Sequence, residues 1–151
     1  MKRKDPLPDE GHVLYTLGTS NRTLEEFLAL LEHYGIRRIL DVRRFPKSRF
    51  EHFCAGELPG HLRSKGIEYS YLGEELGGYR KEGYEAYLQS RGFRKGLNRA
   101  SALARASPSA LLCAERLPWR CHRRFIARAL EEEGWKVTHI IERDRVWAPK
   151  H

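Results

Sequence analysis

The sequence predicts a single-domain three-layer α/β sandwich with a mostly parallel sheet of about five strands. Short apolar runs alternate along the chain with segments of helical periodicity. The apolar runs are continuous, as is typical of strands that are covered on both faces. The chain has 151 residues, of which 40% are hydrophobic and 32% charged, so it is long enough and apolar enough for one domain with a core.

The expected strands are the apolar runs rich in β-branched and aromatic residues. They are residues 12–18, 37–42, 67–72, 109–114 and 136–141. We expect the α/β domain to span residues 12–151. Residues 1–11 are interpreted as a flexible leader, because Pro6, Pro8 and Gly11 interrupt any regular element there.

The first expected helix begins at a capping box formed by Thr23 and Glu26 and ends at Gly35. Its apolar residues recur at the three- and four-residue spacing of one helical face. Further helices are expected at residues 57–65, 84–89, 93–106 and 121–133, with a loop at 73–83. Strands joined through helices favour right-handed crossovers, and therefore a parallel sheet.

Composition narrows the class of partner. The formal net charge is +8 and the pI about 9.6, which favours an anionic small molecule or nucleic acid as partner, or else simply maintains solubility. No apolar run approaches the ~20 residues that cross a bilayer, so we expect no membrane partner. Neither a GxGxxG nor a GxxxxGK[ST] motif occurs, and we expect no cofactor.

The cysteines indicate the compartment. Their number is odd, at three, and no apolar stretch follows the N-terminal charges as it would in a secretory signal. We therefore expect reduced thiols and a cytoplasmic location.

Polar residues follow the ends of the predicted strands, where a parallel sheet opens its ligand crevice. We expect these residues to line one cleft, although they are far apart in the sequence. They are Ser20, Asn21, Asp41, Arg43, Arg49, Tyr79, Cys113, Glu115, Cys121, His122 and Arg123.

Cys121 and His122 would open the last predicted helix, where the helix dipole favours a thiolate and disfavours an imidazolium. A neutral histidine beside such a cysteine could act as a base, or could simply lie hydrogen-bonded at the core edge. Cys113 taken alone is more typical of an inert buried cysteine. Asp41 is either a catalytic carboxylate or the partner of an arginine. The same alternatives hold for Glu115.

A zinc site is the third alternative for these residues. It could draw on Cys54, Cys113, Cys121, His52 or His122. The sequence has no paired CxxC spacing, so we do not predict a bound metal.

Five segments together resemble the bacterial and archaeal family called domain of unknown function 488. They are LGTSNRTLEEFL, ILDVRRFPKSRF, LGEELGG, CAE and CHRRFIA, in that order, and the resemblance extends from about residue 13 to residue 141. Thr19 stands where the family typically has the histidine of its GHSN motif. The DVRxxP, CxE and CHR patterns are matched by Asp41–Pro46, Cys113–Glu115 and Cys121–Arg123. The resemblance implies no established activity.

Two functions are therefore predicted. In the first, the protein is an enzyme acting on a phosphate-bearing or nucleotide-like anion held by Arg43, Arg49 and Arg123. Cys113 or Cys121 would be the nucleophile, and His122, Glu115 or Asp41 would move protons.

In the second, the protein is a non-catalytic module that binds nucleic acid or a nucleotide. Tyr79, Trp119 and Trp147 would then stack on bases. On either hypothesis we expect Cys113 and Cys121 to lie close together and reduced.

Overall fold

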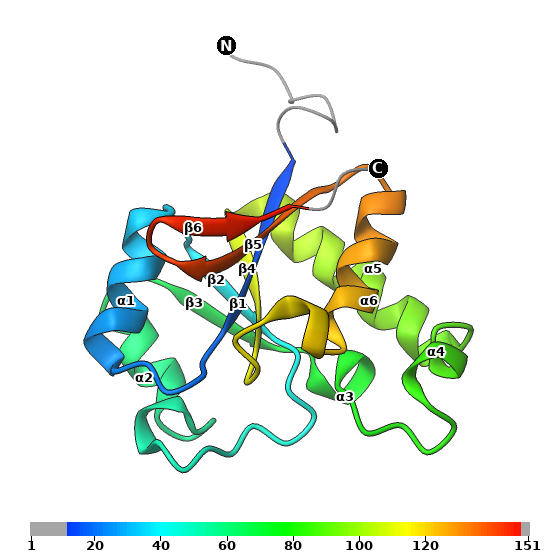
Figure 1. Cartoon of the computed structure of the whole chain (residues 1–151), viewed down its shortest axis with the longest axis horizontal. Helices are drawn as coiled ribbons and strands as arrows, with labels where there is room; N and C mark the ends of the chain where they lie inside the picture. Colours follow the sequence, from blue (N-terminus) through cyan, green and yellow to red (C-terminus); the bar gives the residue numbers. More distant parts are fainter. Residues whose placement is uncertain (1–11, 149–151) are drawn as a thin grey trace.

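The computed structural model describes residues 12–148 as a six-stranded sheet between two layers of helices (Figure 1). The strand order is β3-β2-β4-β1-β5-β6. The strands are β1 (Val13–Gly18), β2 (Arg38–Asp41), β3 (Glu68–Tyr71), β4 (Ser109–Cys113), β5 (Lys136–Glu142) and β6 (Arg145–Trp147). The first five are parallel, which confirms the predicted fold class, whereas the proposed leader at residues 1–11 lies outside the described residues.

The predicted strand count is one too low. Strand β6 pairs antiparallel with β5 and is only three residues long, with all three residues exposed. It therefore lacks the continuous apolar run by which the five parallel strands were predicted.

Helices cover both faces of the sheet. Helices α1 (Leu24–His33) and α2 (Leu58–Arg63) lie on one face. The other face carries α3 (Gly73–Leu76), α4 (Tyr84–Tyr87), α5 (Arg91–Ala106) and α6 (Arg123–Glu132). Two short 3₁₀ helices, η1 (Glu51–Phe53) and η2 (Pro118–Arg120), follow β2 and β4.

The helix boundaries confirm some predictions and correct others. The capping box is present, since Thr23 Oγ1 accepts from the Glu26 amide at 3.0 Å and Glu26 Oε1 accepts from the Thr23 amide at 2.8 Å. The predicted loop at 73–83 contains the one-turn helix α3. The last helix begins at Arg123 and not at Cys121, because the chain first forms the 3₁₀ turn η2, which Cys121 ends.

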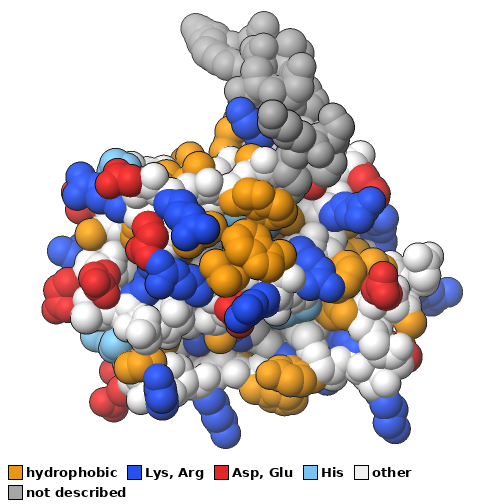
Figure 2. Space-filling model, viewed as in Figure 1, with side chains coloured by type: hydrophobic (Ala, Val, Ile, Leu, Met, Phe, Trp, Pro, Cys, Tyr) orange, Lys and Arg blue, Asp and Glu red, His pale blue; other side chains and the backbone are white. Residues whose placement is uncertain are grey.

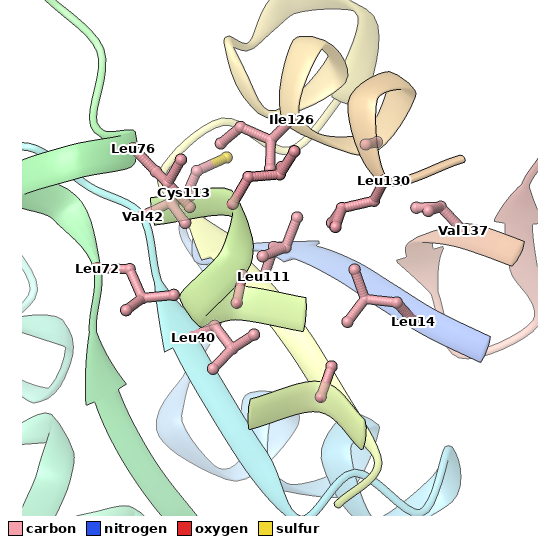
Figure 3. Packing of buried hydrophobic residues seen from close by; sticks show 14 of the residues in the cluster. Leu14, Leu40, Val42, Leu72, Leu76, Leu111, Cys113, Ile126, Leu130 and Val137 are labelled. Carbon is pink, nitrogen blue, oxygen red and sulfur yellow. The ribbon is translucent and has the colours of Figure 1, made fainter. Parts of the chain in front are cut away.

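Each face of the sheet has its own apolar core. One lies against α1 and α2 and includes Leu17, Phe27 and Ile39. The other lies against α3, α5 and α6, and Figure 3 shows that Cys113 belongs to it, beside Val42, Leu76 and Ile126. Cys113 thus ends the central strand β4 at the border between a dry core and the edge where the parallel strands end.

The connections after β2 and β4 leave the sheet on opposite faces. After β2 the chain runs to α2 on one face, and after β4 it runs to α6 on the other. Because β2 and β4 are neighbours, this divergence opens a crevice between their carboxyl ends.

Candidate functional site

A cleft of about 540 Å³ occupies this crevice. It is lined by Arg43, Arg44, Phe45 and Lys47 after β2, by Gly78 and Tyr79 after α3, and by Cys113, Ala114, Glu115, Arg120, Cys121 and His122. An adjoining hollow of about 410 Å³ shares Arg43, Lys47 and Ala114 with it and adds Ser20, Asn21 and Arg49. Residues from four separate stretches of the chain therefore meet at this edge.

Two cysteines form the floor of the cleft, and a buried arginine lies behind them. The Sγ atoms of Cys113 and Cys121 lie 2.9 Å apart without a disulfide bond. Arg123 Nη1 lies 2.7 Å from Cys113 Sγ, and the arginine is fully buried. The sulfur of Cys113 thus touches a cation on one side and a second thiol on the other.

These contacts split the acidities of the two thiols. Burial raises the pKa of Cys113, but the hydrogen bond from Cys121 and the charge of Arg123 outweigh it and lower the pKa to about 7. The pKa of Cys121 is raised far above its ordinary value, because its proton is hydrogen-bonded to Cys113 and because it is buried. Above about pH 7 the pair therefore holds one proton, which Cys121 donates to the thiolate of Cys113.

His122 faces the second thiol with an unprotonated nitrogen. Its Nε2 atom lies 3.0 Å from the carbonyl oxygen of Val42, which only accepts hydrogen bonds, so Nε2 carries the proton. Burial lowers the pKa of the imidazole, and the nearby charges of Arg123 and Arg80 add to this effect. The ring is therefore neutral at pH 7, and its Nδ1 lone pair lies 3.5 Å from Cys121 Sγ.

Asp41 forms a closed ion pair beneath the cleft. Its carboxylate is fully buried and accepts from Arg43 Nε at 2.8 Å and Nη2 at 2.7 Å. It also accepts from the Tyr69 hydroxyl at 2.6 Å. The pKa of Tyr69 is raised by burial and by this carboxylate, so the phenol remains a donor. Of the two alternatives that the sequence left for Asp41, the geometry favours the structural ion pair.

The arginines chosen from the sequence as anion ligands differ in their availability. Arg43 lines the cleft but is only 5% exposed, and its remaining Nη1 donates to the Phe53 carbonyl at 2.7 Å. Arg123 donates to the carbonyls of Glu115 at 2.6 Å and Arg116 at 3.0 Å besides Cys113. Both guanidinium groups already have internal partners, whereas Arg49 is exposed in the adjoining hollow.

Glu115 helps to shape the loop after β4. One carboxylate oxygen accepts from the Leu117 amide at 3.2 Å, and its backbone carbonyl is a partner of Arg123. The loop also lies directly against the end of β1. A Cβ atom on Gly18 would come within 1.9 Å of the Glu115 carbonyl oxygen, so only glycine fits there.

Two residues at the cleft adopt a backbone conformation that is rare outside glycine. Among the described residues, only Ser20 and Tyr79 are non-glycine residues with positive φ, at 49° and 61°. Ser20 belongs to the loop after β1. The backbone amides of this loop donate hydrogen bonds to the Cys113 and Ala114 carbonyls at the end of β4. Both strained residues therefore lie on walls of the cleft region.

The rim of the cleft combines Tyr79, which was predicted from the sequence, with Phe45 and three cations that were not among the predicted site residues. Lys47 and Arg120 are exposed and Arg44 is half-buried, so their charges face solvent. Basic side chains project from this edge of the molecule, the lower edge in Figure 2. Phe45 and Tyr79 are 63% and 86% exposed, with ring centroids 5.9 Å apart. An aromatic residue within the basic stretch RRFPK was the available signal for this rim.

The structure brings most predicted site residues to one edge. Cys113, Glu115, Cys121, His122, Arg43 and Tyr79 line the main cleft, and Ser20, Asn21 and Arg49 line the adjoining hollow. Asp41 and Arg123 lie behind this surface. Trp119 and Trp147 pack against each other, with ring centroids 5.5 Å apart, and neither lines the cleft.

The residues considered for zinc do not form one cluster. Cys54 Sγ pairs with the backbone of Ser48, and His52 Nε2 contacts the Arg22 carbonyl. Within residues 12–148, no group of three or more His, Cys, Asp or Glu side chains has an arrangement that could hold a metal ion. None of the helices in this part of the chain is long and apolar enough to span a membrane.

Fold and site together define a parallel α/β protein with a buried dithiol at the floor of a basic cleft. The chain belongs to the family described as domain of unknown function DUF488, whose model matches residues 23–130. Comparison with curated proteins and with solved structures gave no match.

Proposed function

We propose that the protein is a thiol enzyme acting on a small anionic substrate, with Cys113 as the nucleophile. The observation that carries the proposal is the 2.7 Å contact between Arg123 Nη1 and Cys113 Sγ at the floor of the cleft. A thiolate is the reactive form of cysteine, and an adjacent guanidinium stabilises it near neutral pH. Cys113 is only 1% exposed and lines the cleft, so a reagent would approach its sulfur from that side.

The neighbouring groups have distinct roles in this proposal. Arg123 is a positioning residue that keeps Cys113 ionised and ties the loop after β4 in place. His122 is available to accept or return a proton through Nδ1. The substrate anion is held by the solvent-facing charges of Arg44, Lys47 and Arg120, because Arg43 and Arg123 already have internal partners.

The rim favours an anion that also carries a flat ring. The exposed rings of Phe45 and Tyr79 stand beside these three cations. Aromatic side chains stack on bases, so a nucleotide-like molecule fits both features. The same rim favours a second candidate function, non-catalytic binding of a nucleotide or of single-stranded nucleic acid. Binding of that kind weakens steeply with salt and is indifferent to the state of Cys113.

The reduced state of the dithiol also bears on location. Both cysteines of the pair are free, and the proposed nucleophile requires a reduced thiol. We therefore propose a reducing compartment such as the cytoplasm for the active protein.

Two alkylating reagents of opposite electrostatic preference test the proposal. A Cys54→Ser variant removes the third thiol. The rate at which its remaining cysteines are alkylated is followed with anionic iodoacetate and with neutral iodoacetamide. We expect both reagents to modify Cys113 with an apparent pKa of about 7, and iodoacetate to be preferred at low salt. Phosphate or a nucleotide should protect the thiol.

A matched pair of rim variants gives the control. Lys47→Ala and Arg120→Ala should slow iodoacetate by about two- to tenfold while leaving iodoacetamide unchanged, since they remove attraction without touching the thiolate. Alkylation only above pH 8.5, or equal behaviour of the two reagents in every variant, would refute a thiolate in an anion-binding cleft.

A further inference from the structure

We infer that Cys113 and Cys121 form a redox couple, and that the site passes two electrons from this dithiol to a small anionic disulfide. The inference rests on the proposed function for the reactivity of Cys113 and for entry of the anion. It adds a second reacting residue, a reaction type and a class of co-substrate to that site.

The geometry of the two sulfurs is the first support. Their separation of 2.9 Å is shorter than a normal contact between unbonded sulfur atoms and only about 1 Å longer than a disulfide bond of ~2.05 Å. Cys113 ends strand β4 and Cys121 ends the η2 turn, and the seven-residue connection between them already holds the side chains together. Small side-chain rotations therefore suffice to form the bond.

The two sulfurs have different surroundings, and these give the two cysteines different roles in the reaction. Cys113 has the guanidinium of Arg123 and lies on the cleft, so it is the thiolate that attacks first. Cys121 keeps its proton and faces Nδ1 of the neutral His122. Its thiol is therefore held in reserve beside a base, as a resolving cysteine requires.

The reaction has two steps, an attack by Cys113 and then an attack by Cys121. The Cys113 thiolate attacks one sulfur of the substrate RS–SR, forming a mixed disulfide and expelling one RS⁻. Cys121 then gives its proton to His122 Nδ1, and its sulfur attacks Cys113 Sγ. That attack forms the Cys113–Cys121 bond and expels the second RS⁻, which takes up a proton from solvent or from His122. The dithiol has lost two electrons, and the substrate disulfide has gained them.

The buried arginine also raises the reduction potential of the couple, so the dithiol reduces only a disulfide that is itself a stronger oxidant, such as one whose released thiols are acidic. In the reduced state Arg123 faces a thiolate, and in the oxidised state it faces a neutral disulfide while remaining fully buried. The reduced form is thus selectively stabilised, which makes the internal disulfide easy to reduce. A monothiol can therefore return the pair to its starting state.

The test uses dithiobis(nitrobenzoate), an aromatic dianionic disulfide that matches the basic and aromatic rim. In the full chain carrying Cys54→Ser, we expect two equivalents of coloured thiol per molecule and a Cys113–Cys121 disulfide in the peptide map, with no aryl group retained. In Cys54→Ser/Cys121→Ser, we expect one equivalent and a stable mixed disulfide on Cys113. In Cys54→Ser/Cys113→Ser, release should be at least tenfold slower.

The failures of the two proposals can be told apart. If the Cys54→Ser protein retains an aryl group on Cys113 and releases a single equivalent, the redox inference is overturned while the reactive thiolate of the proposed function survives. If neither cysteine reacts in the folded protein, both fail. If the disulfide forms but iodoacetate shows no charge preference, the couple stands and the anion-binding cleft falls. The decisive peptide map is made on the Cys54→Ser protein, in which both Cys113 and Cys121 are intact. Misfolding of the Cys113→Ser or Cys121→Ser variant would therefore not decide the outcome.

Discussion

Arg43 and Arg123 are both buried at the same cleft, Arg43 just after strand β2 and Arg123 at the start of helix α6, but their partners differ in kind. Arg43 meets the carboxylate of Asp41, which also accepts a hydrogen bond from the Tyr69 hydroxyl. Arg123 meets the sulfur of Cys113, whose charge can be gained and lost near neutral pH. The first pair is closed, and the second can change state beside a cleft.

The difference shows how similar buried cations can serve different ends. A buried guanidinium requires compensation, and a carboxylate supplies it permanently. A thiol supplies this compensation only while it is ionised. The Arg123–Cys113 pair is therefore less stabilising than the Arg43–Asp41 pair, but its sulfur is reactive. The other contacts of the Arg123 guanidinium are to the uncharged backbone carbonyls of Glu115 and Arg116, and its Nε atom has no hydrogen-bond partner, so no carboxylate competes with the thiolate for the charge.

The largest effect on stability is expected at the closed pair. Asp41→Asn keeps the shape of the side chain but leaves Arg43 buried without its counter-ion, which should cost about 3–5 kcal/mol of the free energy of unfolding. Urea denaturation measures this loss. The pKa of Cys113, followed by alkylation in the folded variant, should stay at about 7. A shifted thiol pKa would mean that the two pairs are coupled and that the comparison is too simple.

The open pair should respond in the opposite way. Arg123→Gln removes the cation, but Cys113 can then take up a proton, so no buried charge remains uncompensated. The loss of stability should therefore be smaller, about 1–3 kcal/mol from the hydrogen bonds to the two carbonyls.

Chemistry at Cys113 should change more than stability in this variant. Its pKa should rise above about 7, because the charge of Arg123 no longer offsets burial and only the hydrogen bonds from Cys121 and to the Glu115 backbone still lower it. The pH profile of alkylation checks this, and Arg124→Gln, a change at an exposed neighbour on the same helix, is the control. An unchanged profile would remove Arg123 from the proposed mechanism.

The dithiol should also leave a signature in the pH dependence of stability. The folded pKa of Cys113 is lowered, so between about pH 7 and the ordinary thiol pKa of about 8.5 the unfolded chain binds more protons and stability rises with pH. The pKa of Cys121 is raised, so at higher pH the folded protein keeps a proton that the unfolded chain loses, and stability falls again.

The contribution of the pair should therefore pass through a maximum near pH 8–9, with a rise of at most about 3 kcal/mol. Melting curves of the reduced Cys54→Ser protein, minus those of a variant that also carries Cys113→Ser and Cys121→Ser, isolate this contribution. A flat difference across the range would mean that neither thiol is perturbed by folding.

The same comparison explains what sequence reasoning reached and what it missed. The strand-end rule located Cys113, Cys121 and His122, because the parallel direction of the strands follows from continuous apolar runs joined by helices. It could not distinguish Arg43 and Arg123 from solvent-facing cations, since exposure depends on how the loops fold back. Strand β6 was missed for a related reason: its residues are exposed and its pairing depends on the tight turn that follows β5.

The smallest predicted effect concerns Tyr79, the strained residue on the rim of the cleft. Tyr79 has φ of 61° and is 86% exposed, so its ring gains little from packing while its backbone occupies a region that costs a non-glycine residue about 1 kcal/mol. Tyr79→Asn keeps a side chain but tolerates this region, and should stabilise the protein by about 0.5 kcal/mol. It should also weaken binding of an aromatic anion, because one stacking surface is lost.

Phe45→Ala is the matched control, since Phe45 does not have the positive φ of Tyr79. That change should weaken the same anion without the gain in stability, as measured by melting temperature and by protection of Cys113 from iodoacetate. Reduced stability in Tyr79→Asn with unchanged protection would assign the tyrosine to the fold and remove it from the cleft's recognition surface.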